Sequence, residues 1–290
     1  MHEDSSRGGP RKPMDAATVV LVREGPGGLL VYMGKRNSSG SFAGAHVFPG
    51  GLVEKEDAQA GPAPHGRSPA DLLAEPGIGE ARARGLFTAA VRETFEESGV
   101  LLAAGPGDRP LPVGEKRFSD YRRKIAAREM GLSDMAEAEG LTFPFDRLLP
   151  IARWITPEGA PRRWDTRFFL SRLPDGQEAS PDCEELVAGG WVSPAEALAC
   201  QGRGGFVLFP PTYMTLFFLA GFQRAEDLFE AAAGIRITPI IPSSARQDGQ
   251  YMVILPHDPE HPDNSGADPP ETDGPSRLVL TETGWRPVEG

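Results

Sequence analysis

The sequence is poor in cysteine, with Cys183 and Cys200 the only two among 290 residues. Their spacing matches no cysteine-based metal site, and two lone thiols favour a reduced intracellular protein over a disulfide-stabilised secreted one. The first residues lack an apolar signal region, and the last three, Val288 to Gly290, are not a peroxisomal signal. We therefore expect a cytoplasmic location.

No uninterrupted hydrophobic run is long enough to cross a membrane. The longest apolar stretch, residues 206–222, is broken by Pro210 and Pro211 and predicts a buried helix instead. Positive charge is also scarce, because 30 Lys and Arg face 41 Asp and Glu, which gives a net charge of −11. Without a basic stripe or a membrane span, the sequence predicts neither a nucleic-acid partner nor a membrane partner.

The hydrophobic fraction of 39% is enough for a substantial core in one large domain or two. Stretches with strand periodicity alternate with stretches of helical periodicity, which predicts an α/β fold. The expected strands cover residues 18–23, 29–35, 149–156, 166–173 and 185–192. The expected helices cover residues 86–98, 116–130, 194–199 and 213–233.

The two ends of the chain differ from its middle. Residues 1–15 are rich in Gly, Pro and charge and predict a disordered tail. Residues 235–290 predict a small β-rich extension with β-like runs at 236–241, 250–255 and 277–281 and a flexible loop at 256–276. From Asp248 onward, nine acidic residues against two arginines contribute −7 of the net charge.

The most informative segment is Arg92-Glu93-Thr94-Phe95-Glu96-Glu97-Ser98-Gly99-Val100. On a helix, Glu93, Glu96 and Glu97 stand at i, i+3 and i+4, so their side chains converge on one face. Three anions this close repel one another unless a cation neutralises them, and hard carboxylate ligands suit Mg²⁺ or Mn²⁺. Arg92 precedes Glu96 by one turn and is expected to pair with it. The alternative interpretation is an ordinary solvated acidic helix face.

The context of this segment favours the metal site. A β-like run, residues 45–49, leads into Gly50-Gly51, where bare backbone can approach a ligand closely. Gly99 is a typical helix C-cap, followed by an apolar run. An acidic helix is therefore expected to face a glycine loop.

These residues resemble the signature of the Nudix hydrolases, Gly-x5-Glu-x7-Arg-Glu-U-x-Glu-Glu-x-Gly-U, where U is a bulky apolar residue. The second half matches from Arg92 to Val100, with Thr94 in an apolar position. Counting from Gly51, Asp57 occupies the position of the first Glu, and 34 residues instead of seven separate it from Arg92. We interpret residues 58–84 as an insertion, a loop with at most a short helix at 68–73.

An interrupted motif of this kind resembles the coenzyme A diphosphatase branch of the family, the nucleoside diphosphate-linked moiety X motif 19 type. The resemblance also covers residues 35–37, 44–51, 154–157, 164–170 and 209–212. It implies a Nudix-like α/β/α sandwich with a mixed β-sheet over residues 16–234, followed by the small β-rich extension. The upstream segment 42–47 fits the bacterial coenzyme A signature only loosely.

The resemblance also implies roles for individual residues. Glu96 and Glu97 would bind Mg²⁺ or Mn²⁺, Glu93 would bind the cation or activate water, and the carbonyl of Gly50 or Gly51 would complete the shell. Arg92 would support the metal ligands from behind. A further carboxylate often arrives from a later loop, and Glu184 and Glu185 are the candidates; the alternative is an exposed loop charge.

Three further residues are candidates for substrate binding. Arg36 and His46 fall where the coenzyme A branch carries polar residues near Gly-Gly, and either is placed to contact phosphates. Arg167, with Arg162 and Arg163, flanks the strand expected near the nucleotide. The alternatives are a structural histidine and exposed arginines without a ligand.

Three functions follow. The first is a Mg²⁺- or Mn²⁺-dependent diphosphatase that cleaves coenzyme A or acyl-coenzyme A to 3′,5′-ADP and (acyl-)phosphopantetheine. The second is a diphosphatase for another nucleotide-type small molecule, such as an ADP-sugar, NADH or a nucleoside triphosphate. The third is a non-catalytic nucleotide-binding module, against which the three clustered glutamates argue. Homodimer formation is left open by the sequence.

Overall fold

The computed structural model describes residues 12–39, 42–58, 67–109, 111–247, 249–263 and 274–288. Its centre is a mixed sheet in the order β3-β2-β1-β6-β5-β8, with β4 paired to β1 and β7 paired to β2. The strands of this sheet are β1 (Met14–Gly25), β2 (Gly28–Arg36), β3 (His46–Val47), β4 (Gly50–Leu52), β5 (Leu149–Ile155), β6 (Trp164–Arg172), β7 (Leu186–Val192) and β8 (Pro239–Ile240). The pairs β1–β6 and β5–β8 are parallel, and the others are antiparallel.

Strand β1 lies in the interior of the sheet, and both of its faces are buried. Ala17, Val19 and Leu21 belong to one hydrophobic core, and Val20 and Val22 belong to a second core on the opposite face. Successive side chains of a strand point to opposite faces, so the continuous apolar run Val19 to Val22 requires a layer of structure on each side. The α/β/α sandwich expected from the sequence is confirmed.

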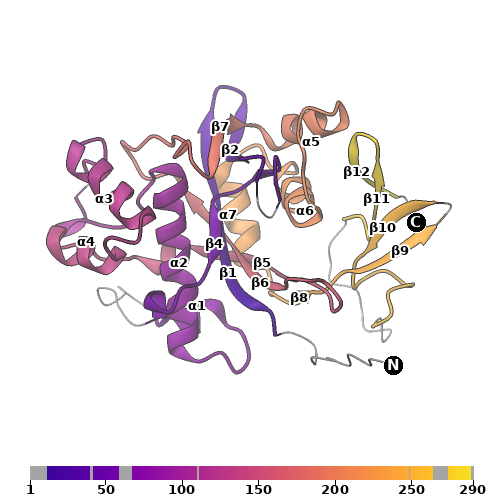
Figure 1. Cartoon of the computed structure of the whole chain (residues 1–290), viewed down its shortest axis with the longest axis horizontal. Helices are drawn as coiled ribbons and strands as arrows, with labels where there is room; N and C mark the ends of the chain where they lie inside the picture. Colours follow the sequence, from indigo (N-terminus) through magenta and orange to yellow (C-terminus); the bar gives the residue numbers. More distant parts are fainter. Residues whose placement is uncertain are drawn as a thin grey trace, which may run out of the picture.

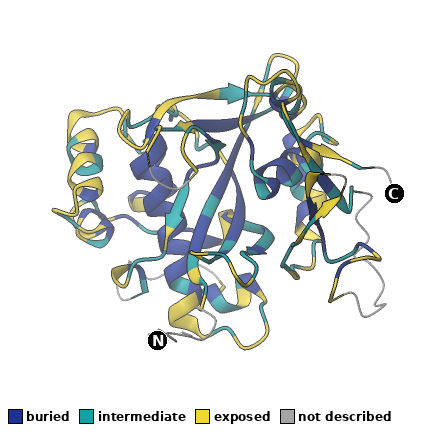
Figure 2. Ribbon diagram, turned by 45° about the vertical axis from the view of Figure 1, so that its right-hand side comes forward, coloured by how far each residue is buried: buried dark blue, intermediate teal, exposed yellow. Residues whose placement is uncertain are grey.

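Helices cover both faces of the sheet, as Figure 1 shows, and the strands between them are mostly buried in Figure 2. On one side lie α1 (Pro69–Leu73), α2 (Glu80–Ser98), α3 (Lys116–Ala126) and α4 (Leu132–Glu139). On the other lie α5 (Pro194–Gly202), α6 (Pro210–Leu219) and α7 (Ala225–Ala233). Short 3₁₀ turns occur at Glu56–Ala58, Pro106–Asp108 and Phe145–Arg147.

Several boundaries differ from the expected ones. The expected helix 213–233 is two helices, because the chain turns between Ala220 and Arg224. Helix α2 begins at Glu80, so the end of the predicted insertion forms its first turn, and α1 is the short helix expected there. Helix α4 was not expected. Residues 59–66 of the insertion lie outside the described residues.

The C-terminal extension is β-rich, as expected, but it is not separate from the core. Strands β9 (Ser243–Gln247), β10 (Gln250–Ile254), β11 (Arg277–Thr281) and β12 (Gly284–Pro287) form an antiparallel sheet. Val253, Leu278 and Trp285 pack in the same hydrophobic core as Leu216 of α6. Of the expected acidic loop, residues 264–273 lie outside the described residues.

Two expectations at the ends of the chain are corrected. The expected strand at 236–241 belongs to the main sheet, because Pro239 and Ile240 pair with Arg153 and Trp154 of β5. Strand β1 starts at Met14, so Met14 and Asp15 of the predicted N-terminal tail belong to the sheet; residues 1–11 lie outside the described residues. No helix among the described residues is long and apolar enough to span a membrane.

Candidate active site

The three glutamates of α2 are buried. Glu93, Glu96 and Glu97 expose 8%, 7% and 2% of their surface, although each carries a carboxylate. They lie in the last two turns of the helix, which ends at Gly99 with a left-handed φ of 72°. Burial excludes the alternative of a solvated acidic face, because isolated buried carboxylates are costly and need a compensating partner.

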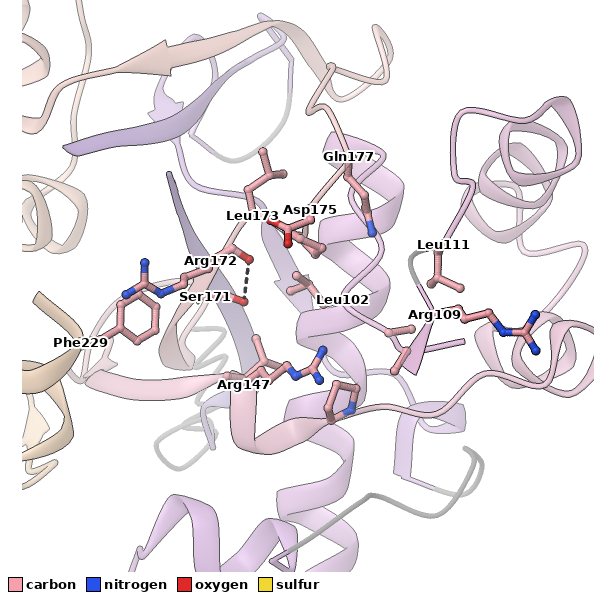
Figure 3. Close-up of a pocket in the computed structure, with 15 residues that line it drawn as sticks. Leu102, Arg109, Leu111, Arg147, Ser171, Arg172, Leu173, Asp175, Gln177 and Phe229 are labelled. Atoms are coloured by element: carbon pink, nitrogen blue, oxygen red, sulfur yellow. Dashed lines mark hydrogen bonds between the residues drawn. The ribbon is translucent and has the colours of Figure 1, made fainter. Parts of the chain in front are cut away.

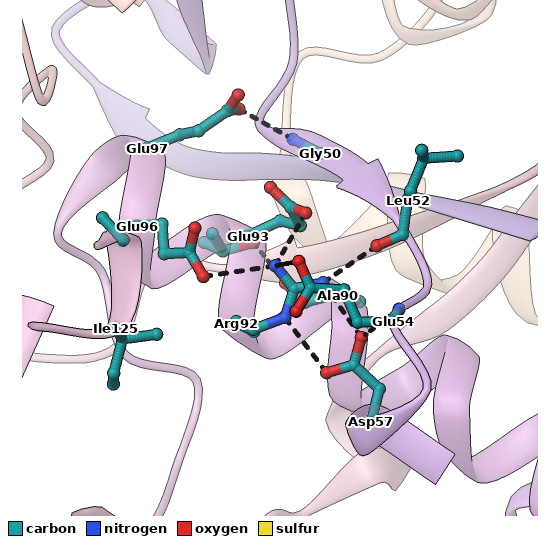
Figure 4. Close-up of polar contacts among 12 residues, drawn as sticks. Gly50, Leu52, Glu54, Asp57, Ala90, Arg92, Glu93, Glu96, Glu97 and Ile125 are labelled. Atoms are coloured by element: carbon teal, nitrogen blue, oxygen red, sulfur yellow. Dashed lines mark hydrogen bonds and ion pairs between the residues drawn. The ribbon is translucent and has the colours of Figure 1, made fainter. Parts of the chain in front are cut away.

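Arg92 is the central partner of this cluster, as Figure 4 shows. Its Nη1 donates to Glu93 at 2.8 Å and to Glu96 at 3.2 Å. Its Nε and Nη2 donate to the two carboxylate oxygens of Asp57 at 3.0 and 2.9 Å, and Nη2 also donates to the carbonyl of Leu52 at 2.8 Å. Burial acts to lower the pKa of Arg92, but the hydrogen bond to Asp57 and the nearby carboxylates raise it.

The glycine loop approaches the helix as the sequence predicted. Strand β4 pairs with β1, and the backbone N–H of Gly50 donates to Glu97 Oε2 at 2.9 Å. A Cβ atom at Gly51 would lie 2.4 Å from Glu93 Oε1, a distance that van der Waals contact forbids. Glycine is needed at this position because the carboxylate of Glu93 rests against bare backbone.

The cluster carries more negative charge than its present partners neutralise. Burial raises the pKa of Glu93 to about 7, with Arg92 opposing the shift and Glu96 adding to it. Burial, together with the charge of Glu93, also raises the pKa of Glu97 well above its usual value. Glu97 Oε1 is buried and has no hydrogen-bond partner among the described residues. A carboxylate oxygen that accepts no hydrogen bond, beside two further carboxylates, is the donor set that a hard divalent cation takes.

The side chains do not form a complete coordination shell for a metal ion. No three His, Cys, Asp or Glu side chains in the described part of the chain converge closely enough to hold an ion as they stand. Arg92 occupies an oxygen of Glu93 and one of Glu96, and Arg128 pairs with the other oxygen of Glu96 at 3.1 Å. The residues fit a cation, but binding it requires an ion pair to open.

Arg36 connects this cluster to the later loop. Its Nη1 lies 3.6 Å from Glu97 Oε1, and its Nη2 lies 3.2 Å from Glu185 Oε2. The backbone N–H of Glu185 donates to Asp182 at 2.7 Å, so the loop before β7 is fixed by a side-chain cap. The sequence prediction that a carboxylate from this loop lies near the acidic helix agrees with this position of Glu185. Glu184 contributes its carbonyl oxygen, which accepts from Asn37.

His46 is half-buried and packed. Its ring stacks on Phe206 with centroids 3.9 Å apart, and its Nδ1 accepts from the backbone N–H of Val207 at 3.2 Å. Burial, aided by Lys35, lowers its pKa to about 4. The ring is therefore neutral near pH 7, and its role toward a substrate stays a prediction.

The expected substrate role of Arg167 is corrected by its surroundings. The side chain is fully buried, and its donors bond to Asp15 at 2.9 Å and to Glu75 at 2.8 and 2.9 Å. Asp165 is a third carboxylate partner at 2.9 Å, and a guanidinium surrounded in this way has no exposed face for a ligand. Since Glu75 belongs to the insertion, Arg167 fastens the insertion to the sheet.

Sequence reasoning missed two arginines near the cluster. Arg122 of α3 donates to the carbonyl of Glu96 at 2.9 Å and to that of Ser180 at 3.0 Å. Arg128, just after α3, reaches Glu96 and Glu54. No local pattern marks either residue, because only the path of the chain after α2 brings them to the carboxylates.

A pocket of about 480 Å³ lies elsewhere, beyond the C-terminal end of α2, and none of the clustered glutamates lines it. Figure 3 shows Arg147 and Arg172 at this pocket, with Leu102, Leu173 and Phe229. Buried Gln177 forms part of its wall, and its amide bonds to the backbone of Leu101 at 2.9 and 3.0 Å. The carboxylate cluster is therefore not part of this pocket.

Comparison with known proteins agrees with the class that fold and site define. The fold is similar to the crystal structure of a NUDIX hydrolase from Alicyclobacillus acidocaldarius, with a TM-score of 0.61 and 26% identity, over 79% of this chain and 99% of that one. The model of the NUDT19 Nudix domain matches residues 83–219.

Two relatives are named acyl-coenzyme A diphosphatase NUDT19. The protein from Gallus gallus is 31% identical over 87% of this chain and 81% of its own length. The protein from Homo sapiens is 28% identical over 79% of this chain and 74% of its own length. The chain therefore belongs to the NUDT19 family of Nudix hydrolases, and the resemblance stated from its sequence is confirmed.

Proposed function

We propose that this enzyme hydrolyses the pyrophosphate bond of coenzyme A or acyl-coenzyme A and depends on Mg²⁺ or Mn²⁺. The products are 3′,5′-ADP and the corresponding phosphopantetheine. The observation that carries the proposal is the buried cluster of Glu93, Glu96 and Glu97, in which one oxygen of Glu97 accepts no hydrogen bond from the described residues. The activity named for the two relatives supports the choice of substrate.

In this proposal, Glu96 and Glu97 would hold the cation, and the carbonyl of Gly50 or Gly51 would complete its shell. A bound divalent cation would neutralise the pyrophosphate charge and lower the pKa of a bound water. Arg92 keeps the carboxylates in place from behind, because its own position is fixed by Asp57.

Two carboxylates are placed to accept the proton of the attacking water. Glu93 is buried against Gly51, within the cluster, and Glu185 is exposed on the loop held by Arg36. The water oxygen forms a bond to one phosphorus, the bridging P–O bond breaks, and the bridging oxygen leaves with the other phosphate. Separate Glu93→Gln and Glu185→Gln variants assign the base, because loss of the true base lowers kcat by about 100-fold or more.

Arg36 is the candidate contact for the substrate phosphates. Its guanidinium is partly exposed and already lies between two carboxylates, Glu97 and Glu185. Arginine matches the geometry of phosphate oxygens and keeps its charge at every physiological pH. His46, on the neighbouring strand β3, is the second candidate and would contact the substrate as a neutral ring.

The test is a turnover screen with Mg²⁺ or Mn²⁺ against coenzyme A, acetyl-coenzyme A, NADH, ADP-ribose and GTP. We expect release of 3′,5′-ADP from coenzyme A, abolished in the Glu96→Gln/Glu97→Gln double variant. Glu80→Gln, at the exposed start of the same helix, is the matched control and keeps full activity. If only another nucleotide is turned over, that nucleotide takes the place of coenzyme A as the proposed substrate. If none of the five compounds is hydrolysed in a cation-dependent way, the proposal is overturned.

A further inference from the structure

Arg128 adopts a backbone conformation that arginine rarely takes. Its φ is +59°, in the left-handed region, where a side chain other than glycine costs about 1 kcal/mol or more. Four non-glycine residues in the described part of the chain have positive φ, and Arg128 is the one whose side chain pairs with the acidic helix. The strained turn after α3 directs this guanidinium at the cluster.

The contacts of Arg128 are with carboxylates. Its Nη1 lies 3.1 Å from Glu96 Oε2, and its Nη2 forms an ion pair with Glu54. The other oxygen of Glu96 is taken by Arg92 at 3.2 Å. Both oxygens of a carboxylate assigned to the cation are therefore occupied by arginines.

The two arginines differ in how readily they can give way. The side chain of Arg92 is 5% exposed and also bonds Asp57 and Leu52, so its removal would leave buried groups without partners. The side chain of Arg128 is 52% exposed, and its two other hydrogen bonds, to backbone carbonyls, are 3.4 Å long. An ion pair whose arginine is half exposed to water is weaker than one buried on both sides, so Arg128 is the partner that a cation displaces.

We propose that Arg128 neutralises Glu96 until a divalent cation binds, and that the released guanidinium then pairs with the pyrophosphate of the incoming nucleotide. The second half rests on the proposed function. A pyrophosphate bound at the cation lies next to Glu96, and Arg128 reaches Glu96 already. The guanidinium of Arg128, once the cation displaces it from Glu96, would thus pair with the phosphate oxygens of the substrate.

The first measurement is Mn²⁺ binding by calorimetry to the wild type, Arg128→Gln and Arg128→Lys. We expect Arg128→Gln to bind Mn²⁺ about two- to five-fold more tightly, because a half-exposed arginine that competes for Glu96 is gone. Arg128→Lys retains the competing charge and should stay near the wild type. Weaker Mn²⁺ binding by Arg128→Gln would show that Arg128 braces Glu96 and would overturn the proposal.

The second measurement is binding of ADP, the diphosphate common to such substrates, at saturating Mg²⁺. Loss of a charge-assisted contact in Arg128→Gln should weaken ADP binding by about ten-fold, with partial rescue in Arg128→Lys. Unchanged ADP affinity would overturn the substrate half. Neither measurement needs turnover of coenzyme A, so failure of the proposed function is seen separately.

The matched control is Arg123→Gln, which removes an arginine of α3 whose ion pair is with Glu129, outside the cluster. It should change neither Mn²⁺ nor ADP binding. Thermal unfolding of each variant establishes that the differences arise in folded protein.

Discussion

Asp57 and Arg92 form a bidentate, buried ion pair across the insertion, with donor distances of 3.0 and 2.9 Å. Asp57 immediately precedes the insertion, and seven residues of α2 separate the end of the insertion from Arg92. The pair joins the two halves of the motif in space although the chain separates them.

Replacement of Asp57 by asparagine should therefore cost both stability and activity. Breaking a buried ion pair costs about 3 kcal/mol. The Nε and Nη2 atoms of Arg92 would then lack their carboxylate partner, and the guanidinium would compete with a cation for the carboxylates of Glu93 and Glu96. Urea unfolding and kcat measure the two effects. Glu56→Gln, an exposed neighbour in the same 3₁₀ turn, is the control and should differ from the wild type by less than about 0.5 kcal/mol.

Gly51→Ala should lower kcat by about 100-fold, because the new methyl group would displace the carboxylate of Glu93 and small displacements of reacting groups are costly. Steady-state kinetics with Mn²⁺ provide the measurement. A Cβ at Gly114 meets no atom within 4 Å, so Gly114→Ala should behave as the wild type. A fully active Gly51→Ala enzyme would show that the position of Glu93 is unimportant.

Glu97→Gln should stabilise the cation-free protein while abolishing activity. Because the pKa of Glu97 is raised in the folded state, its ionisation destabilises the fold as pH rises above the usual carboxyl range. At pH 8 in EDTA, we expect the free energy of unfolding to increase by about 1 kcal/mol relative to the wild type.

The same melts with Mn²⁺ give the converse result, since the cation should raise the Tm of the wild type more than that of Glu97→Gln. The control is Glu137→Gln, on the exposed side of α4, which should alter neither melt. A Glu97→Gln variant that is less stable than the wild type in EDTA would contradict the claim that the buried charge of Glu97 destabilises the cation-free fold.

Arg167→Ala should destabilise the protein by about 3 kcal/mol, because it removes the fully buried arginine between Asp15 and Glu75, which then keep only the more exposed Arg82 and Arg153 as partners. The KM for coenzyme A should stay within about two-fold of the wild type, a difference below about 0.5 kcal/mol. Arg162→Ala, at an exposed position, serves as the control for both. A large rise in KM without loss of stability would restore the substrate role expected from the sequence.

Protonation of His46 should contribute to acid unfolding. Its pKa is about 4 in the folded protein against 6.5 in the unfolded chain, so the unfolded state binds more protons between these values. Stability attributable to His46 is therefore present above pH 6.5 and is lost as pH falls toward 4. The effect should be about 1 kcal/mol, because the ring is only half-buried.

Comparison of the pH dependence of unfolding for the wild type and His46→Gln isolates this term. The variant should lose less stability between pH 7 and pH 4.5. Identical profiles would show that protonation of His46 does not contribute to acid unfolding.

Local sequence was sufficient for the central elements of the fold. The β-branched, apolar run in β1 predicted a strand, and the apolar residues on both of its faces agree with a sheet between two helical layers. The spacing of Glu93, Glu96 and Glu97 predicted one converging face, which depends only on helix geometry. Segment boundaries such as the break between α6 and α7 were missed, because continuous apolar patterning does not show where a chain turns.

The sequence by itself determined which residues share a face, because side-chain direction repeats with the local backbone period. It therefore determined the acidic face of α2. Only the tertiary structure decided the fates of Arg128 and Arg167, two residues of the same charge. One reaches the carboxylates of α2 from a strained turn, and the other is buried between Asp15 and Glu75. Such ion pairs join segments far apart in the chain, and which segments meet depends on how the whole chain packs.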